Sequence, residues 1–418
     1  MSLNNKIFLL CFLCAFSLQA QTLSLQSAID TTLKFNSDLI ISDYDQKALE
    51  HSKNSVHVER YGKIDFKLDY NHYNTPRTLM PLTPPINPSV STSDDLIGAT
   101  FSYTLPLFDG FEKTSEIKIL DLRAKMQEKQ RFILEKNLIF NVKATFFKAL
   151  SLQNQLTINA QYVEYTKAFL EQIQLKENSG KASKLDVLHA KVNYTQSLAK
   201  QKNIQSDLEI LKAYLAQLMH QEKCEYTLEE IMPATIFVST PSSFKDLQSL
   251  QIYSLEEQRK EQEHAKVRSL YYPKVDFFAS HSDVYGAGDH ALISQYGLSF
   301  RWNIFDFGKK SNLLEKSSLE LLKAKTQSDK KRLEIIRKQK ELQEKCLKLD
   351  EAIKTYAEEL SLKQSILEIE KIKYEEGKAT ILDFIEAKNH KENSHLSLID
   401  ARYNRMIAGF ELDNLLEK

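Results

Sequence analysis

The sequence contains one segment nearly twice. Residues 180–191 read GKASKLDVLHAK and residues 377–388 read GKATILDFIEAK, at an offset of 197 residues. Upstream, residues 107–109 (LFD) return as residues 304–306 (IFD) at the same offset, so the roughly seventy residues between the two landmarks contain no net insertion. A tandem repeat of this length predicts two copies of one architectural unit. A symmetric object such as a tube or a ring needs such a repeat, whereas an enzyme active site does not.

Glycine and proline are scarce, with only 10 Gly and 9 Pro among 418 residues. Neither occurs from residue 111 to 179 or from 309 to 376, so each stretch predicts a helix about 100 Å long. A return helix of roughly forty residues follows each glycine, which predicts antiparallel hairpins with apolar, coiled-coil seams. The expected hairpins are 111–222 and 309–416, within two repeats of one single unit, 21–222 and 243–418, and residues 223–242 are expected to form a small equatorial segment.

Charge and motifs exclude several classes of function. Lys plus Arg and Asp plus Glu both number 56, so no positive excess is present for binding nucleic acid. The sequence has no HExxH spacing, no glycine-rich phosphate loop and no nucleophile elbow. His390 and His395 are five residues apart, which is a poor metal-binding pair on one helix. We therefore expect no enzyme, no cofactor and no resident metal.

The first 20 residues predict a secretory signal peptide. Lys6 supplies the positive start, residues 7–16 are apolar, and Ala20 is suited to precede the cleavage site. A buried amphipathic N-terminal helix is the alternative, but the apolar run has no polar stripe. No later stretch of eighteen apolar residues predicts a membrane-spanning helix. The mature chain would retain Cys224 and Cys346, which could form one disulfide or remain two thiols.

Four short segments alternate between apolar and polar residues, the pattern of a half-buried strand. Their apolar faces are rich in aromatic residues and their polar faces carry charge, as in a transmembrane β-barrel. An ordinary antiparallel sheet packed on helices is the alternative. Four strands cannot close a barrel in lipid, so several chains must contribute, and three chains would give twelve strands. The expected strands lie near residues 62–74, 95–106, 273–284 and 292–304.

In its order of elements, the mature chain resembles the TolC-like outer-membrane efflux proteins. The resemblance depends on two strand pairs, each followed by a helical hairpin, and on the two hairpin turns. It also includes an opening helix at residues 23–34 and the closing segment 400–404. The resemblance implies a mixed α/β membrane protein, a homotrimer whose shared twelve-stranded barrel crosses the outer membrane above a tunnel of long helices in the periplasm. Such proteins are passive exit ducts of tripartite efflux pumps or type I secretion systems.

The resemblance also implies partners and sites. An inner-membrane pump would act through a periplasmic adaptor, and outer-membrane lipid would surround the barrel. The hairpin turns would be the tunnel tips that dock on the adaptor, because small residues permit close backbone approach. A simpler interpretation is that each glycine only terminates a helix. The predicted docking residues are Gly180, Lys181, Ala182, Gly377, Lys378 and Ala379.

A pore gate is expected beside these turns. Asp383 and Glu386 are three residues apart and share one helix face, so three chains would form a ring of six carboxylates. Such rings favour cations and bind divalent ions that block flow. Asp186 holds the place of Asp383 in the first repeat, and Tyr374 matches a tyrosine that tethers the closed tip in the family. The family's tethering arginine is absent, since Ala379 stands there. A secreted coiled-coil adhesin or scaffold is the alternative function.

Overall fold

The computed structural model describes residues 21–82, 84–85, 90–224, 226–231 and 247–418. The predicted signal peptide and most of the equatorial segment lie outside these residues. The chain divides into two compact units, which we call the sheet unit and the hairpin unit. The sheet unit comprises residues 37–136, 239–340 and 415–418, and the hairpin unit comprises 1–36, 137–238 and 341–414.

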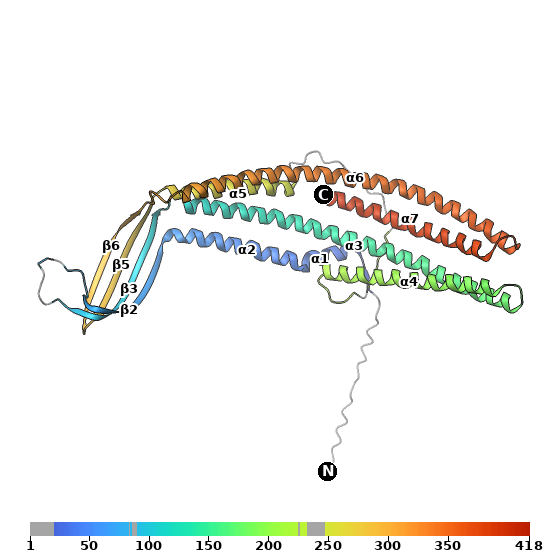
Figure 1. The fold of residues 1–418 in the computed structure, drawn as a ribbon, viewed down its shortest axis with the longest axis horizontal. Coiled ribbons are helices and arrows are strands. Elements are labelled where there is room, and N and C mark those ends of the chain that lie inside the picture. Colours follow the sequence, from blue (N-terminus) through green and yellow to red (C-terminus); the bar gives the residue numbers. More distant parts are fainter. Residues whose placement is uncertain (1–20, 83, 86–89, 225, 232–246) are drawn as a thin grey trace, which may run out of the picture. The chain divides into compact units, whose positions relative to one another are not determined.

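Two helices of 67 residues, α3 (Glu112–Asn178) and α6 (Lys309–Glu375), begin in the sheet unit and end in the hairpin unit. The described chain is thus mostly helical with some antiparallel sheet, which confirms the prediction of fold class at that level (Figure 1). No helix among the described residues combines the length and apolarity needed to cross a membrane.

The sheet unit holds four antiparallel strands in the order β2-β3-β5-β6, which lie side by side (Figure 1). Each strand pair continues directly into α3 or α6, and each is preceded by a helix and one turn of 3₁₀ helix. The strands β2 and β6 form the two edges, so one side of each has no partner within this sheet. The bounds are α2 Ser37–Val58, η1 Glu59–Tyr61, β2 Lys63–Thr78, β3 Thr92–Phe108, α5 Gln248–Arg268, η2 Ser269–Tyr271, β5 Lys274–Gly286 and β6 Asp289–Arg301.

The strand ends differ from those expected. Strand β2 continues past Pro76 to Thr78, because its register shifts between His72 and Arg77, where a residue without an N–H does not interrupt the ladder. At the other edge, β6 ends at Arg301, before the predicted limit of residue 304. Trp302 instead donates its indole N–H to the carbonyl oxygen of Tyr271, at 3.1 Å.

One face of the sheet exposes large apolar side chains. Alternating residues point to opposite sides of a strand, so one side of β2 and β6 gathers the large apolar side chains. Phe66 on β2 also packs against Phe101 on β3, with 4.7 Å between ring centroids. Ile64, Phe66, Leu68, Tyr70, Tyr296, Leu298 and Phe300 are all exposed.

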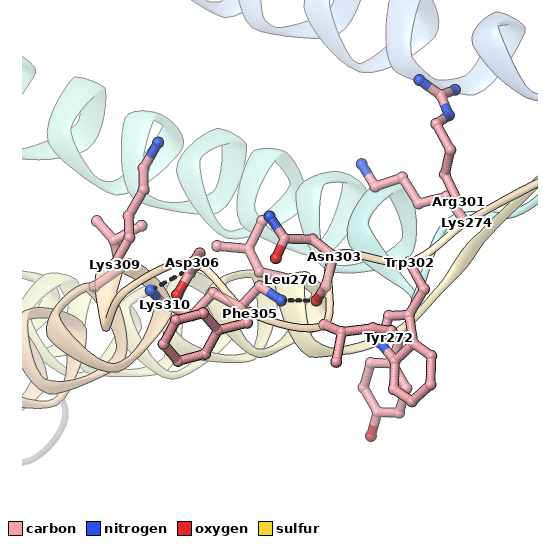
Figure 2. A pocket seen from close by; sticks show the side chains of 12 residues that line it. Leu270, Tyr272, Lys274, Arg301, Trp302, Asn303, Phe305, Asp306, Lys309 and Lys310 are labelled. Carbon is pink, nitrogen blue, oxygen red and sulfur yellow. Dashed lines mark hydrogen bonds between the residues drawn. The ribbon is translucent and has the colours of Figure 1, made fainter.

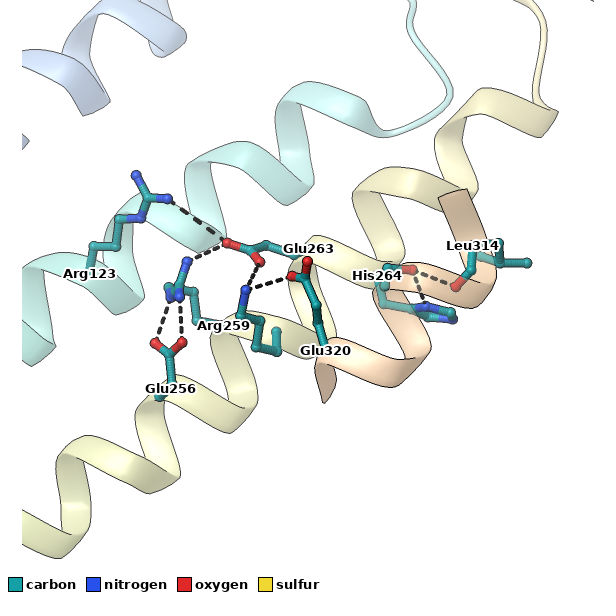
Figure 3. Close-up of polar contacts among 9 residues, drawn as sticks. Arg123, Glu256, Arg259, Glu263, His264, Leu314 and Glu320 are labelled. Atoms are coloured by element: carbon teal, nitrogen blue, oxygen red, sulfur yellow. Dashed lines mark hydrogen bonds and ion pairs between the residues drawn. The ribbon is translucent and has the colours of Figure 1, made fainter. Parts of the chain in front are cut away.

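Ion pairs attach α5 to α3 and α6 (Figure 3). On α5, Arg259 pairs with Glu256 and Glu263, and Glu256 raises the pKa of this guanidinium. Lys260 reaches Glu320 on α6 at 2.8 Å, and one turn later His264 bonds Ser317 at the same distance. Because these groups are partly exposed, each pair contributes little stability. The pairs of Arg259 lie within α5, and the bonds from Lys260 and His264 join α5 to α6.

The two strand-to-helix junctions have the same backbone conformation. Two consecutive residues adopt positive φ in each, namely Gly110 and Phe111 before α3, and Phe307 and Gly308 before α6. The second junction lines a cavity of about 560 Å³. Lys274 and Arg301, which are paired across β5 and β6, also line it, as do Tyr272 and Trp302. The first two side chains point to one side and the last two to the other (Figure 2).

The hairpin unit packs the later parts of α3 and α6 with α4 (Lys184–Leu218) and α7 (Ile381–Leu415). Phe146 and Leu150 on α3, Leu215 on α4 and Leu412 on α7 are almost fully buried. The short strands β1 (Gln21–Leu23) and β4 (Tyr226–Leu228) pair in parallel beside α1 (Leu25–Phe35). The amide of Asn36, which follows α1, donates to the carbonyl oxygen of Leu218 at 3.0 Å and so closes the end of α4.

Candidate functional site at the hairpin tips

Both long helices end in the same glycine turn. Gly180 and Gly377 have φ of +71° and +73°, the left-handed conformation that glycine adopts without strain. The next residue bonds back five positions, from Lys181 N to Lys176 O at 2.8 Å and from Lys378 N to Lys373 O at 2.7 Å. A Cβ on either glycine would meet nothing within 4 Å. Within one chain these glycines are therefore required by backbone conformation and not by packing.

Both return helices begin with a capping box. Ser183 N donates to Asp186 Oδ2 at 2.8 Å, and Asp186 N donates back to Ser183 Oγ at 3.1 Å. In the second repeat, Thr380 N donates to Asp383 Oδ2 at 2.9 Å, and Asp383 N donates to Thr380 Oγ1 at 3.2 Å. The two aspartates predicted for the gate thus hold the first turn of α4 and α7.

The carboxylates at the second tip lie open to solvent. Asp383 and Glu386 are both exposed, and Glu386 makes no hydrogen bond or ion pair with another described residue. The hydrogen bonds from Thr380 lower the pKa of Asp383, with a smaller contribution from the charge of Lys373. Asp383 therefore keeps its charge at mildly acidic pH. Lys378, on the turn itself, pairs with Glu376 at 2.7 Å.

Tyr374, predicted as a tether, packs in the apolar core of the tip. Its ring stacks on Phe384 with centroids 5.5 Å apart and an interplanar angle of 10°, and it meets Phe169 at 6.4 Å. Burial raises the pKa of Tyr374, and the charge of Asp186 raises it further. The ring of Tyr374 is therefore held by aromatic contacts with Phe384 and Phe169.

An aromatic ladder that the sequence analysis missed joins the two hairpins. On α3, Tyr165 stacks on Tyr162 at 6.4 Å and on Phe169 at 6.1 Å, and Phe169 continues the ladder to Phe384 on α7 at 5.5 Å. The ammonium of Lys388 lies 4.1 Å from the centroid of the Tyr165 ring. The spacing of three and four residues between the α3 aromatics was the available sequence signal.

A polar network lies deeper in the same unit. Asn389 on α7 donates to Asn193 on α4 at 3.1 Å, and the hydroxyl of Tyr162 on α3 bonds both asparagines. Buried Glu392 on α7 accepts from Asn159 on α3 at 2.9 Å. The bonds among Tyr162, Asn193 and Asn389 join the three helices and fix their relative register, while the amide oxygen of Asn159 is buried without a hydrogen-bond partner.

The tips present exposed turns and exposed carboxylates. No group of three or more His, Cys, Asp or Glu residues able to hold a metal occurs among the described residues. Cys224 and Cys346 are both free thiols. The six turn residues and the exposed carboxylates are at the extreme end of the hairpins, where a partner can reach them.

A family model described as outer membrane efflux protein matches residues 28–220 and 247–417. These stretches cover most of the chain and are interrupted where the equatorial segment was expected. No curated protein matches the sequence.

Several solved structures share the fold at low sequence identity. CusC, described in connection with transmembrane channel formation, has a TM-score of 0.80 at 12% identity, over 94% of this chain and 91% of CusC. The outer membrane protein VceC of Vibrio cholerae has a TM-score of 0.76 at 14% identity, over 94% and 96%. The outer membrane channel CmeC of Campylobacter jejuni has a TM-score of 0.78 at 13% identity, over 94% and 85%.

Proposed function

Because this chain belongs to the outer membrane efflux protein family, we propose that it is the passive exit duct of a tripartite efflux pump or a type I secretion system. Three copies form a twelve-stranded barrel in the outer membrane, and their hairpins form a tunnel in the periplasm. A periplasmic adaptor links the tunnel to an inner-membrane pump, which supplies the energy.

The exposed apolar face of the sheet is the observation that carries this proposal. Phe66, Leu68 and Tyr70 on β2, and Leu298 and Phe300 on β6, are all more than half exposed. A monomeric soluble protein rarely exposes an apolar patch of this extent. Lipid covers such a face, and a closed ring of strands leaves neither edge unpaired. A coiled-coil scaffold outside the membrane would explain neither feature.

The hairpin unit also presents apolar surface that one chain does not cover. A row of large aliphatic side chains follows α6 at spacings of three and four residues, so its members lie on one face of the helix. A neighbouring hairpin in a ring would bury this row. Its exposed members are Leu362, Ile366, Ile369 and Ile372.

The tips are the proposed gate and docking site. Asp383 and Glu386 from three copies form the acidic ring. Asp186 and Tyr374 are the other two residues of the proposed gate. The adaptor contacts the turns, whose glycines have open space around them. The proposed docking residues are Gly180, Lys181, Ala182, Gly377, Lys378 and Ala379.

Conductance of the purified protein in a planar bilayer tests the duct and the ring together. We expect stable, cation-preferring steps that an added divalent cation blocks. Asp383→Ala with Glu386→Ala should raise the blocking concentration roughly tenfold, about 1.4 kcal/mol of binding free energy. Unchanged block would remove the ring and leave the duct, whereas folded protein that never inserts would reject the duct.

Docking can be separated from helix capping by asparagine at the turns. Asparagine tolerates positive φ, so Gly180→Asn with Gly377→Asn should preserve the helix ends while adding side chains to the contact surface. In cells where the wild-type chain supports efflux of a fluorescent dye, most of that efflux should be lost, with bilayer conductance unchanged. Full efflux would show that the glycines only terminate helices.

A further inference from the structure

The two strand pairs are copies of each other in sequence. Residues 61–66 read YGKIDF at the start of β2, and residues 272–277 read YPKVDF at the start of β5, at an offset of 211. The offset from β3 to β6 is 197, as in residues 107–109 and 304–306. Each strand therefore has a known equivalent in the other repeat.

The hydrogen-bonded registers obey the same two offsets. Lys63 pairs with Thr104 in the first hairpin. A shift of 211 carries Lys63 to Lys274, a shift of 197 carries Thr104 to Arg301, and Lys274 does pair with Arg301. The last regular pair of the first hairpin, His72 with Asp95, likewise maps onto the observed pair Asp283 with Leu292. The repeat thus preserves strand register over the whole regular ladder.

Within the four-stranded sheet, the two repeats meet through one strand pairing, that of β3 with β5. Tyr103 pairs with Ala279 and Phe101 pairs with His281 across it. The corresponding contact in the other direction joins β6 to β2, which are the two open edges of the sheet. A strand of the same chain cannot complete it without closing a four-stranded ring, so a second copy is the occupant that fits.

We propose that β6 of one copy pairs antiparallel with β2 of the next copy, in the register that the β3–β5 contact prescribes. The offsets carry Tyr103 to Phe300 and Ala279 to Leu68, so Phe300 lies opposite Leu68 of the next copy. By the same operation Leu298 lies opposite Tyr70, and Ser299 opposite Asp69. This subunit seam rests on the proposed oligomeric barrel and adds its residue-level register.

The apolar residues of the two edges agree with this register. Phe300 and Leu68 are 64% and 66% exposed, whereas their templates Tyr103 and Ala279 are half-buried. Leu298 and Tyr70 are 68% and 65% exposed, and their templates Phe101 and His281 are also exposed. The register places apolar side chains opposite apolar ones on one face. A slip of one residue would place Phe300 opposite Lys67 or Asp69 and reverse every side chain.

Cysteine cross-linking tests the seam in the full chain, with its four cysteines, Cys11, Cys14, Cys224 and Cys346, replaced by serine. Residues directly opposite in antiparallel strands have Cα atoms about 4.5–5.5 Å apart, within the range of a disulfide. Phe300→Cys with Leu68→Cys should cross-link most chains into covalent oligomers on mild oxidation. The intramolecular pair Tyr103→Cys with Ala279→Cys is the matched control, since it has the template geometry and should close without any increase in mass.

Cysteine pairs shifted by one residue from the proposed register serve as the negative control. Phe300→Cys combined with Lys67→Cys or Asp69→Cys should give few covalent oligomers, and either single cysteine should give none. Efficient oligomers from a slipped pair would overturn the register. If the control pair closes and the variants conduct in bilayers but no pair cross-links between chains, the seam is wrong and the duct survives. Monomeric, non-conducting protein would instead reject the proposed function.

Discussion

The junction between β3 and α3 packs against Ser269 and Tyr272, which lie between α5 and β5 of the same chain. The equivalent junction between β6 and α6 is far more open. Gly110 is buried, and a Cβ there would lie 2.8 Å from the carbonyl oxygen of Ser269 and 2.9 Å from the Cβ of Tyr272. A Cβ on Gly308 would meet nothing within 4 Å. Phe108 is half-buried, but its equivalent Phe305 is 73% exposed.

The order of glycine and phenylalanine is reversed between the two junctions, although both positions keep positive φ. Gly110 and Phe111 have φ of +71° and +69°, and Phe307 and Gly308 have +57° and +91°. The close approach of Tyr272 requires glycine first in the covered junction, while the open junction tolerates a side chain there. A second copy that reaches the open junction must therefore accommodate the ring of Phe307, which is 92% exposed.

Replacing Gly110 or Gly308 by alanine should give the largest difference in stability between the two junctions. A left-handed alanine costs about 1–2 kcal/mol at either site. Gly110→Ala also forces its Cβ into Ser269 and Tyr272, and overpacking of this kind adds roughly 1–3 kcal/mol. Thermal unfolding followed by circular dichroism should show a clearly larger loss for Gly110→Ala than for Gly308→Ala. Equal losses of stability would mean that Ser269 and Tyr272 move aside at little cost to admit the new Cβ.

Phe307→Gly should change the stability of the open junction by a smaller amount. Positive φ is strained for a bulky aromatic residue, so glycine should stabilise the separated chain by about 1 kcal/mol. If the exposed ring contacts a second copy, the same change should weaken the assembled oligomer. Unfolding of the separated chain, compared with the temperature at which the oligomer dissociates, measures the two effects. A gain in both would show that the ring makes no useful subunit contact.

The smallest expected effect compares the return helices at equivalent positions, His395 on α7 and Leu198 on α4. Burial lowers the pKa of His395, and the charges of Lys391 and Arg402 lower it further. The unfolded chain binds the proton first, so stability should fall as pH drops through about 6.5 towards the lower folded pKa, and level off below it.

His395→Leu gives the second helix the residue of the first and should flatten this dependence. The measurement is the free energy of unfolding of each protein between pH 8 and pH 5. Carboxylates titrate mainly below that range, so they contribute similarly to both proteins. Identical slopes for wild type and variant would exclude His395 as the source.

Periodicity predicted the elements well because both strand and helix patterns are local. Alternation from Ile64 to Tyr70 placed β2, and the absence of breakers placed α3 and α6. The continuation of β2 past Pro76 was not predictable, because it depends on a register shift against β3. Alternation fixes only the face that a residue occupies, so it could not decide that Lys63 pairs with Thr104.

At the tips, sequence spacing predicted the turns at Gly180 and Gly377 but only part of the surrounding chemistry. It placed Asp383 and Glu386 on one exposed face, which the structure has. The bond between Thr380 and Asp383 was available as a Ser/Thr-x-x-acid signature and was overlooked. The position of Tyr374 against Phe384 depends on packing between helices distant in sequence, so no local pattern could supply it.

The equal registers of the two hairpins have a kinetic consequence. The contact between β3 and β5 forms within one chain, so its rate does not depend on concentration. The proposed contact between β6 and β2 of another copy would be bimolecular, so dilution would slow it selectively. A ring with two such strand contacts would thus assemble in two separable phases, and each chain would enter the second phase with its β3–β5 contact already formed.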